Sequence, residues 1–137
     1  MNTLLMPVIV SLSVFLSSAY DQSGLEGRDY ECMKKLNLTV DFVVNGFDEY
    51  NFLREGDPEL NAFLNCTWRK AGYLTTEGQI NPDGLKAWLE VDLIQKKPGI
   101  KTTAEDLVRP CQSIRGDDPG DTGIKVYNCI VRTLWGV

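Results

Sequence analysis

Apolar residues recur at steps of three and four along most of the chain, which is the spacing that one face of a helix produces. The run from Leu60 to Ala71 is an example, with apolar side chains at positions 60, 63, 64, 68 and 71. Glycine and proline interrupt these runs and mark loops. The pattern predicts an all-α domain of about six helices, at residues 25–36, 40–45, 58–71, 82–97, 103–111 and 122–134.

Start signals define several of these helix boundaries. Asp57 followed by Pro58 combines an N-cap with proline at the first helical position. Thr102 and Glu105 have the spacing of a capping box for the fifth helix. Because residues 116–120 form a Gly- and Pro-rich turn signal, we expect the last helix to begin after it, with Asp121 or Thr122 as cap.

The polar segment 48–56 carries three large apolar or aromatic side chains, Tyr50, Phe52 and Leu53. They either fill the outer part of the core or line the mouth of a pocket. The periodicity alone does not separate these two interpretations.

The first 19 residues contain no Lys, Arg, Asp or Glu and are largely apolar between Leu4 and Leu16. They end in Ser17-Ser18-Ala19, small residues typical of a signal peptidase site. We therefore predict a signal peptide at 1–19 and one domain at 20–137, on a secreted, extracellular protein. The alternative is an N-terminal membrane anchor, although the apolar run is shorter than the ~18 residues that a span needs. No membrane span is expected in the mature chain.

Composition restricts the function. The chain has no histidine and a net charge of −5, and its lysines and arginines form no cluster. An acidic chain of this kind does not favour nucleic acid as a partner. Without histidine it lacks the commonest zinc ligand and the usual triad base, so we expect no metal, no cofactor and no catalytic residue. The acidic pair Asp117-Asp118 lies in a turn, where burial would not perturb it, so we do not expect an enzyme.

The four cysteines, Cys32, Cys66, Cys111 and Cys129, follow the predicted export signal and suggest a disulfide framework. Four cysteines allow three pairings. Cys111 and Cys129 flank a single turn between two predicted helices, which makes their pairing natural and leaves Cys32 with Cys66.

The cysteine spacing and three segments, 66–74, 77–81 and 126–130, resemble the insect odorant-binding protein family (PBP/GOBP), in its four-cysteine minus-C form. The resemblance covers about residues 30–134. Ala62 and Gly120 stand where typical six-cysteine members carry their second and fifth cysteines, which pair with each other. By this alignment positions 62 and 120 are neighbours, and we expect room to restore the bridge there. The related D7 salivary proteins have a similar four-cysteine arrangement.

The resemblance implies an odorant-binding protein-like fold around an apolar cavity, with a role in olfaction or transport. It also implies a carrier that reversibly binds a small hydrophobic or amphipathic ligand such as an odorant, a pheromone or a lipid-like molecule. A receptor or another protein is a further possible partner. The candidate ligand-binding residues are apolar or aromatic, with core packing as the alternative for each: Phe52, Leu53, Leu74, Leu85, Trp88, Leu89, Tyr127, Val131 and Trp135.

The alternative function is a D7-like scavenger of biogenic amines or lipid mediators, or a protein-interaction module on the same fold. An amine site requires a carboxylate beside aromatic rings. Asp48, Glu49 and Asp92 are the candidates, and a solvated surface position is the alternative for each.

Two tripeptides match the N-glycosylation acceptor pattern, Asn37-Leu38-Thr39 and Asn65-Cys66-Thr67. The first lies between two predicted helices, which makes Asn37 the candidate site. The second adjoins a bridging cysteine inside a predicted helix, so we expect it to be unmodified.

Overall fold

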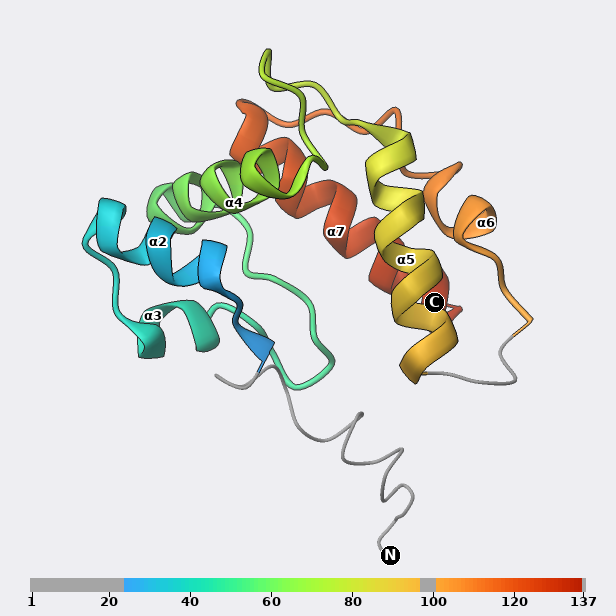
Figure 1. Ribbon diagram of the computed structural model, residues 1–137, viewed down its shortest axis with the longest axis horizontal. Coiled ribbons are helices and arrows are strands. Elements are labelled where there is room, and N and C mark those ends of the chain that lie inside the picture. Colours follow the sequence, from blue (N-terminus) through green and yellow to red (C-terminus); the bar gives the residue numbers. More distant parts are fainter. Residues whose placement is uncertain (1–23, 97–100, 137) are drawn as a thin grey trace, which may run out of the picture. The chain divides into compact units, whose positions relative to one another are not determined.

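The computed structural model describes residues 24–96 and 101–136 (Figure 1). These residues form helices and no strand longer than an isolated bridge, so the all-α prediction is confirmed. The predicted signal peptide at 1–19 lies outside them. The helices are α2 (Gly27–Leu36), α3 (Val40–Val44), α4 (Pro58–Ala71), α5 (Pro82–Lys96), α6 (Ala104–Val108) and α7 (Pro119–Trp135). Contacts divide the chain into two units, an N-terminal one up to Arg54 and a C-terminal one from Glu55.

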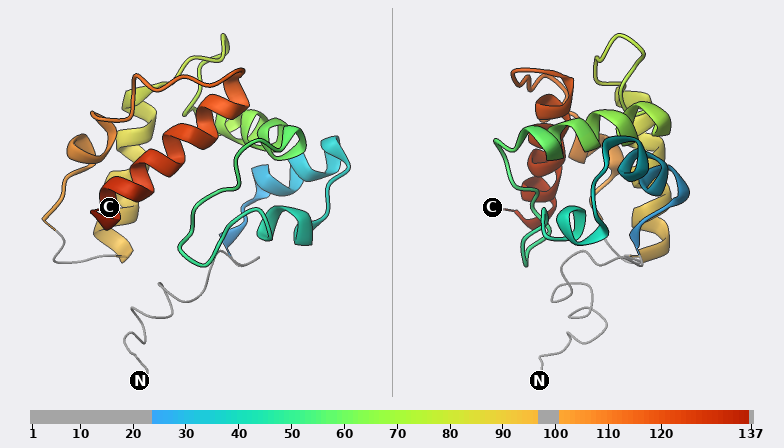
Figure 2. Two further views of the ribbon diagram at one scale, coloured as in Figure 1. Left: turned by 180° about the vertical axis from the view of Figure 1, so that it is seen from behind. Right: turned by 90° about the vertical axis from the view of Figure 1, so that its left-hand side faces the viewer.

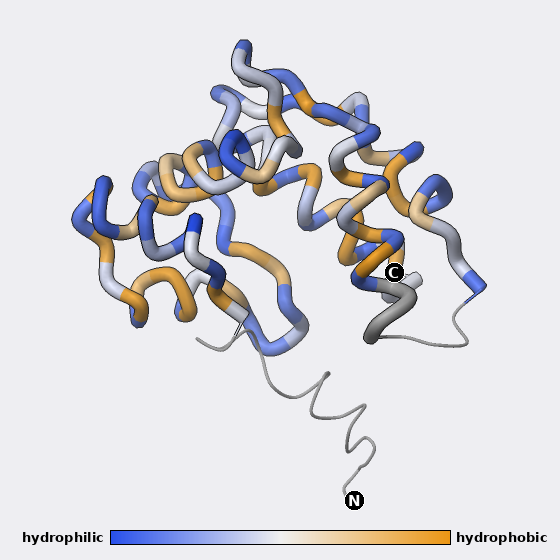
Figure 3. Tube along the Cα trace, in the orientation of Figure 1, coloured by the Kyte–Doolittle hydropathy of each residue, from blue (hydrophilic) through white to orange (hydrophobic). Residues whose placement is uncertain are grey.

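The N-terminal unit holds two short helices whose ends are fixed by capping. Glu26 and Asp29 form a capping box at the start of α2, two residues later than the sequence predicted. Asn37 ends α2 with a left-handed backbone, at φ 58°. The next helix, α3, begins at the predicted residue 40, and Thr39 caps it, because its Oγ1 accepts a hydrogen bond from the backbone N–H of Phe42 (3.0 Å). Figure 3 shows α3 as an almost uniformly hydrophobic segment.

The C-terminal unit is built on the packing of α4 against α7, while α5 packs on α6, which also contacts α7 (Figure 2). Asp57 caps α4 and Gly72 ends it at φ 86°, as the sequence predicted. Glycines on α7 permit the close approach to α4. A Cβ atom added at Gly123 would lie 3.0 Å from Cδ2 of Leu64.

Two predicted helix caps are wrong. Thr103, not Thr102, caps α6, since its Oγ1 accepts from the N–H of Asp106 (3.1 Å). The Glu105 carboxylate, expected in the capping box, pairs with Lys86 (2.8 Å). Asp118 caps α7, ahead of Pro119, which repeats the Asp-Pro signal that begins α4. The predicted caps of that helix, Asp121 and Thr122, are both buried inside its first two turns.

The disulfides are those predicted. Cys111 and Cys129 are bonded with a Cα–Cα distance of 5.7 Å, and Cys32 is bonded to Cys66, which leaves no free cysteine. Cys111 lies beyond the end of α6 rather than inside it as predicted, because Val108 is the last helical residue and Pro110 cannot continue the helix.

Position 120 does adjoin α4, at Asn61, the residue before Ala62, but there is no room for a side chain. A Cβ atom at Gly120 would lie 2.0 Å from the backbone oxygen of Asn61. The expectation that the missing bridge fits here is therefore wrong for the helices as they stand, since their backbones are already in contact.

Candidate ligand-binding site

The segment 46–54 folds into a hairpin-like loop at the end of α3. Phe47 and Leu53 form an antiparallel bridge, flanked by backbone hydrogen bonds from Arg54 to Gly46 and from Asp48 to Phe52, both 2.8 Å. The Asp48 carboxylate holds the tip, because its Oδ1 accepts from the N–H groups of Tyr50 and Phe52, both at 2.9 Å. A single acidic side chain thereby orders the loop from inside.

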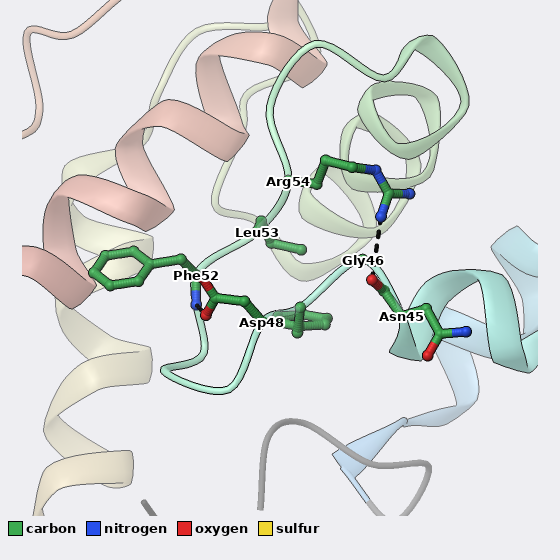
Figure 4. A pocket seen from close by; sticks show the side chains of 7 residues that line it. Asn45, Gly46, Asp48, Phe52, Leu53 and Arg54 are labelled. Carbon is green, nitrogen blue, oxygen red and sulfur yellow. Dashed lines mark hydrogen bonds between the residues drawn. The ribbon is translucent and has the colours of Figure 1, made fainter. Parts of the chain in front are cut away.

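A pocket of about 290 Å³ lies beside this loop (Figure 4). Its volume is close to the lower limit of ~300 Å³ that is usual for small-molecule sites. Leu53 is buried, at 4% exposure, and Phe52 is partly exposed. The wall combines apolar side chains with polar ones, and consists of Asn45, Gly46, Phe47, Asp48, Phe52, Leu53 and Arg54.

Arg54 gives this pocket a cationic edge. Its Nη1 donates to the backbone oxygen of Asn45 (3.1 Å), and its guanidinium carbon lies 5.6 Å from the centre of the Phe42 ring. Both contacts fix the guanidinium group. The pocket therefore offers an apolar surface between a carboxylate and a guanidinium, a combination that suits a small amphipathic molecule.

Of the three residues singled out in segment 48–56, Phe52 and Leu53 line the pocket. Tyr50 does not line it and is 60% exposed at the loop tip. Among the amine-site candidates, Asp48 lines the pocket, Glu49 is exposed and Asp92 is partly exposed on α5. Sequence reasoning missed Arg54 and Phe47, although their position on either side of an acidic tip is typical of a hairpin.

The other seven candidate residues belong to the C-terminal unit. Four of them are buried, and these are Leu74, Leu85, Leu89 and Val131. The remaining three are Trp88, Tyr127 and Trp135, which are partly exposed. Burial is expected both for a core residue and for the wall of an enclosed cavity, so it does not separate the two roles. The partly exposed aromatic side chains are therefore the better candidates for ligand contact.

Trp88 belongs to an aromatic cluster that the sequence did not reveal. Its ring packs on Tyr73, with centroids 5.3 Å apart, and Tyr73 meets Trp68 edge-on at 5.5 Å. Tyr73 follows the helix-ending Gly72, and its N–H bonds the Trp68 oxygen (2.9 Å). The chain reverses at Gly72, and this reversal brings the Tyr73 ring back onto Trp68. Helical periodicity cannot predict such a reversal.

A network of charged and polar side chains lies at the start of α7. The N–H of Asp117 and the ammonium group of Lys125 lower the pKa of Asp121 below its ordinary value. Asp121 in turn raises the pKa of Lys125, which also contacts Glu55 at 3.4 Å. Asn128 donates to the Glu55 carboxylate (3.0 Å). This network ties the beginning of the C-terminal unit to α7 and has a structural role.

Neither metal-binding clusters nor spanning helices occur in the part of the chain that the structure describes. Over residues 24–96 and 101–136, no three His, Cys, Asp or Glu side chains gather as metal ligands would. None of the helices in those ranges is long and apolar enough to cross a membrane.

The comparisons identify one relationship. Residues 20–133 match the model of the PBP/GOBP family. No curated protein and no solved structure matches the chain. The match spans more than half of the chain, and the two disulfides and the helical fold agree with it. The chain therefore belongs to the PBP/GOBP family, the insect odorant-binding proteins.

Proposed function

We propose that this protein is a secreted carrier that binds a small hydrophobic or amphipathic ligand reversibly, such as an odorant, a pheromone or a lipid-like molecule. The family match over residues 20–133 is the observation that carries the proposal. Members of this family are small-ligand binding proteins rather than enzymes, and they are typically secreted. The predicted signal peptide at 1–19 would direct this chain to the same route.

The pocket beside the 46–54 loop supports the proposal. Phe52 and Leu53 supply apolar surface, and burial of such surface stabilises a complex by roughly 25 cal/mol per Å². A polar head group on the ligand would find donors on Arg54 and an acceptor on Asp48. Within the C-terminal unit, Trp88, Tyr127 and Trp135 remain our candidate ligand-binding residues, because each is partly exposed.

The amine-scavenger alternative is less well supported. Asp48 lines the same pocket as Phe47 and Phe52, the combination that an ammonium site requires, but Arg54 lines it too and brings a positive charge. An ammonium ligand would face both groups. The pocket therefore favours a neutral or anionic amphipathic ligand over an amine.

A displacement assay on refolded mature protein tests the proposal. A fluorescent naphthylamine probe is titrated first, and alcohols, fatty acids, terpenoids and amines then compete with it. We expect saturable probe binding, displacement by at least one of the first three classes, and weaker displacement by amines. Absence of saturable probe binding and of displacement by every class would refute the carrier function, and displacement by amines alone would support the scavenger.

A further inference from the structure

We propose that Asn37 carries an N-linked oligosaccharide on the exported chain and that Asn65 does not. The inference rests on the secretion part of the proposed function, since the modification takes place on the secretory route. Both residues begin an acceptor tripeptide. The structure gives the two tripeptides opposite surroundings.

The Asn37 tripeptide is open. Asn37 is exposed at the end of α2, and its left-handed backbone turns the chain away from the helix. Its backbone N–H bonds the Lys34 oxygen (3.3 Å), while its carboxamide makes no hydrogen bond to the described residues. Thr39 is exposed too, and its hydroxyl accepts one bond from Phe42. A glycan on Asn37 would therefore disrupt no contact of the fold.

All three residues of the Asn65 tripeptide are engaged in contacts of the fold. The Asn65 Oδ1 accepts from Nε of Arg69 at 2.7 Å, and Arg69 also donates to the Thr76 backbone oxygen. Cys66 is disulfide-bonded. Thr67 is 4% exposed, and its hydroxyl points to the Leu64 oxygen (3.4 Å). A glycan on Asn65 would displace Arg69 and the loop that Arg69 holds.

The modification is a group transfer from a lipid-pyrophosphate-linked oligosaccharide. The amide nitrogen Nδ2 of Asn37 forms a bond to the anomeric carbon of the first sugar. The bond from that carbon to the pyrophosphate breaks, and the pyrophosphate leaves with the electron pair. The amide loses one proton, and nothing is oxidised or reduced.

The glycan would leave the pocket accessible. Asn37 precedes α3, whereas the pocket begins with Asn45 after the other end of that helix (Figure 1). Glycan and ligand would thus occupy opposite ends of α3 within the N-terminal unit. We expect enzymatic removal of the glycan to leave the affinity for the naphthylamine probe unchanged.

The test is expression of the full chain, with its own first 19 residues, in eukaryotic secretory cells. Peptide mapping of the secreted protein before and after treatment with peptide N-glycosidase locates the glycan, because the enzyme leaves Asp at the modified position. The variants are Asn37→Gln, Asn65→Gln and the conservative Thr39→Ser. We expect one glycan on the wild type, on Asn65→Gln and on Thr39→Ser, and none on Asn37→Gln.

Unmodified Asn37 in the wild-type chain, or a glycan at Asn65, would overturn the inference. The wild-type peptide map gives this answer even if a variant fails to fold. Probe binding by the same samples separates the inference from the carrier function: protein that is glycosylated at Asn37 but does not bind the probe contradicts the function alone. Unglycosylated protein that binds the probe contradicts this inference alone.

Discussion

The loops 46–54 and 73–81 have the same backbone structure and different surroundings. Phe47 and Leu53 bridge the first loop, and Leu74 and Ile80 bridge the second at the same spacing. Each loop has the same flanking hydrogen bonds, and each has a left-handed residue at the equivalent place, Asn51 at φ 74° and Gly78 at φ 84°. In both, the N–H of the left-handed residue bonds the backbone oxygen three positions earlier, as in a tight hairpin turn.

The surroundings separate the two loops. The first is held from inside by Asp48 and leaves a pocket at its side. The second has one such internal bond, from the N–H of Gln79 to the Thr75 hydroxyl, and is also held from outside. Arg69 donates to the Thr76 oxygen, and a Cβ atom at Gly78 would lie 2.7 Å from Cγ of Pro119. The same turn can therefore border a ligand site or support a helix junction, depending on what packs against its left-handed residue.

The largest loss of stability is expected from a substitution at Gly78, where the second loop packs against Pro119 and Arg69. Gly78→Ala puts a residue with a Cβ atom into a left-handed backbone conformation, which should destabilise the fold by ~1–2 kcal/mol. The new Cβ atom also clashes with Pro119 and Arg69, which should cost a further ~1–3 kcal/mol. Gly56→Ala is the matched control, because Gly56 has φ 86° and nothing within 4 Å of the added atom. Urea unfolding of both variants should show the larger loss of unfolding free energy for Gly78→Ala. Equal losses would show that the loop is not packed as described.

A smaller effect is expected from the side chains that close each tip. Asp48→Ala removes two hydrogen bonds from the first loop and should loosen the pocket wall. We expect the probe to bind about tenfold more weakly, a loss of ~1.4 kcal/mol in binding free energy. Thr75→Ala removes the equivalent bond to Gln79 in the second loop (3.1 Å) and should leave probe affinity unchanged. If both variants bind the probe like the wild type, the pocket is not the ligand site.

The acid stability of the C-terminal unit should depend on Asp121. Its pKa is lowered in the folded state, so its stabilising contribution is present above the ordinary Asp value of ~3.9 and is lost as pH falls through the folded value. Asp121→Asn should therefore flatten the dependence of the unfolding free energy on pH below about 4. Asp83→Asn, at a side chain that is 96% exposed, is the control. A wild-type slope in Asp121→Asn would contradict the assignment.

The smallest effect is expected from pH on ligand binding. The chain has no histidine, the residue whose ordinary pKa of ~6.5 makes it the usual sensor in this range. The dissociation constant of the best ligand should thus change little between about pH 5 and about pH 7.5, which is roughly where histidine titrates. A tenfold loss at the acidic end, ~1.4 kcal/mol, would require a carboxylate with a raised pKa at the site.

Local signals in the sequence were enough to predict the helices and disulfides. Asp57-Pro58 and Thr39 cap helices where predicted, because a capping residue acts on backbone groups two or three positions away. The start of α7 was missed because Asp118-Pro119 lies in a run that also reads as a turn. The similarity of loops 46–54 and 73–81 was not predictable, since the two segments have the same backbone conformation but different sequences.

The candidate site was predictable only in part, for the same reason. Phe52 and Leu53 were selected as apolar residues in a polar segment, and both line the pocket. Arg54 was missed, and Asp48 was selected only as a candidate carboxylate for an amine. Both contribute through hydrogen bonds that depend on the turn geometry, which apolar periodicity does not encode. The contact of Gly120 with the Asn61 backbone likewise depends on how closely α4 and α7 approach.

The most direct test of the proposed ligand site is an NMR titration of isotope-labelled mature protein with the best ligand from the displacement assay. Saturable shifts are predicted for the backbone amides of Asp48, Phe52, Leu53 and Arg54, while the amides at the tip of the second loop, residues 75–79, keep their positions. Saturable shifts at residues 75–79 with none at residues 48–54 would contradict this account.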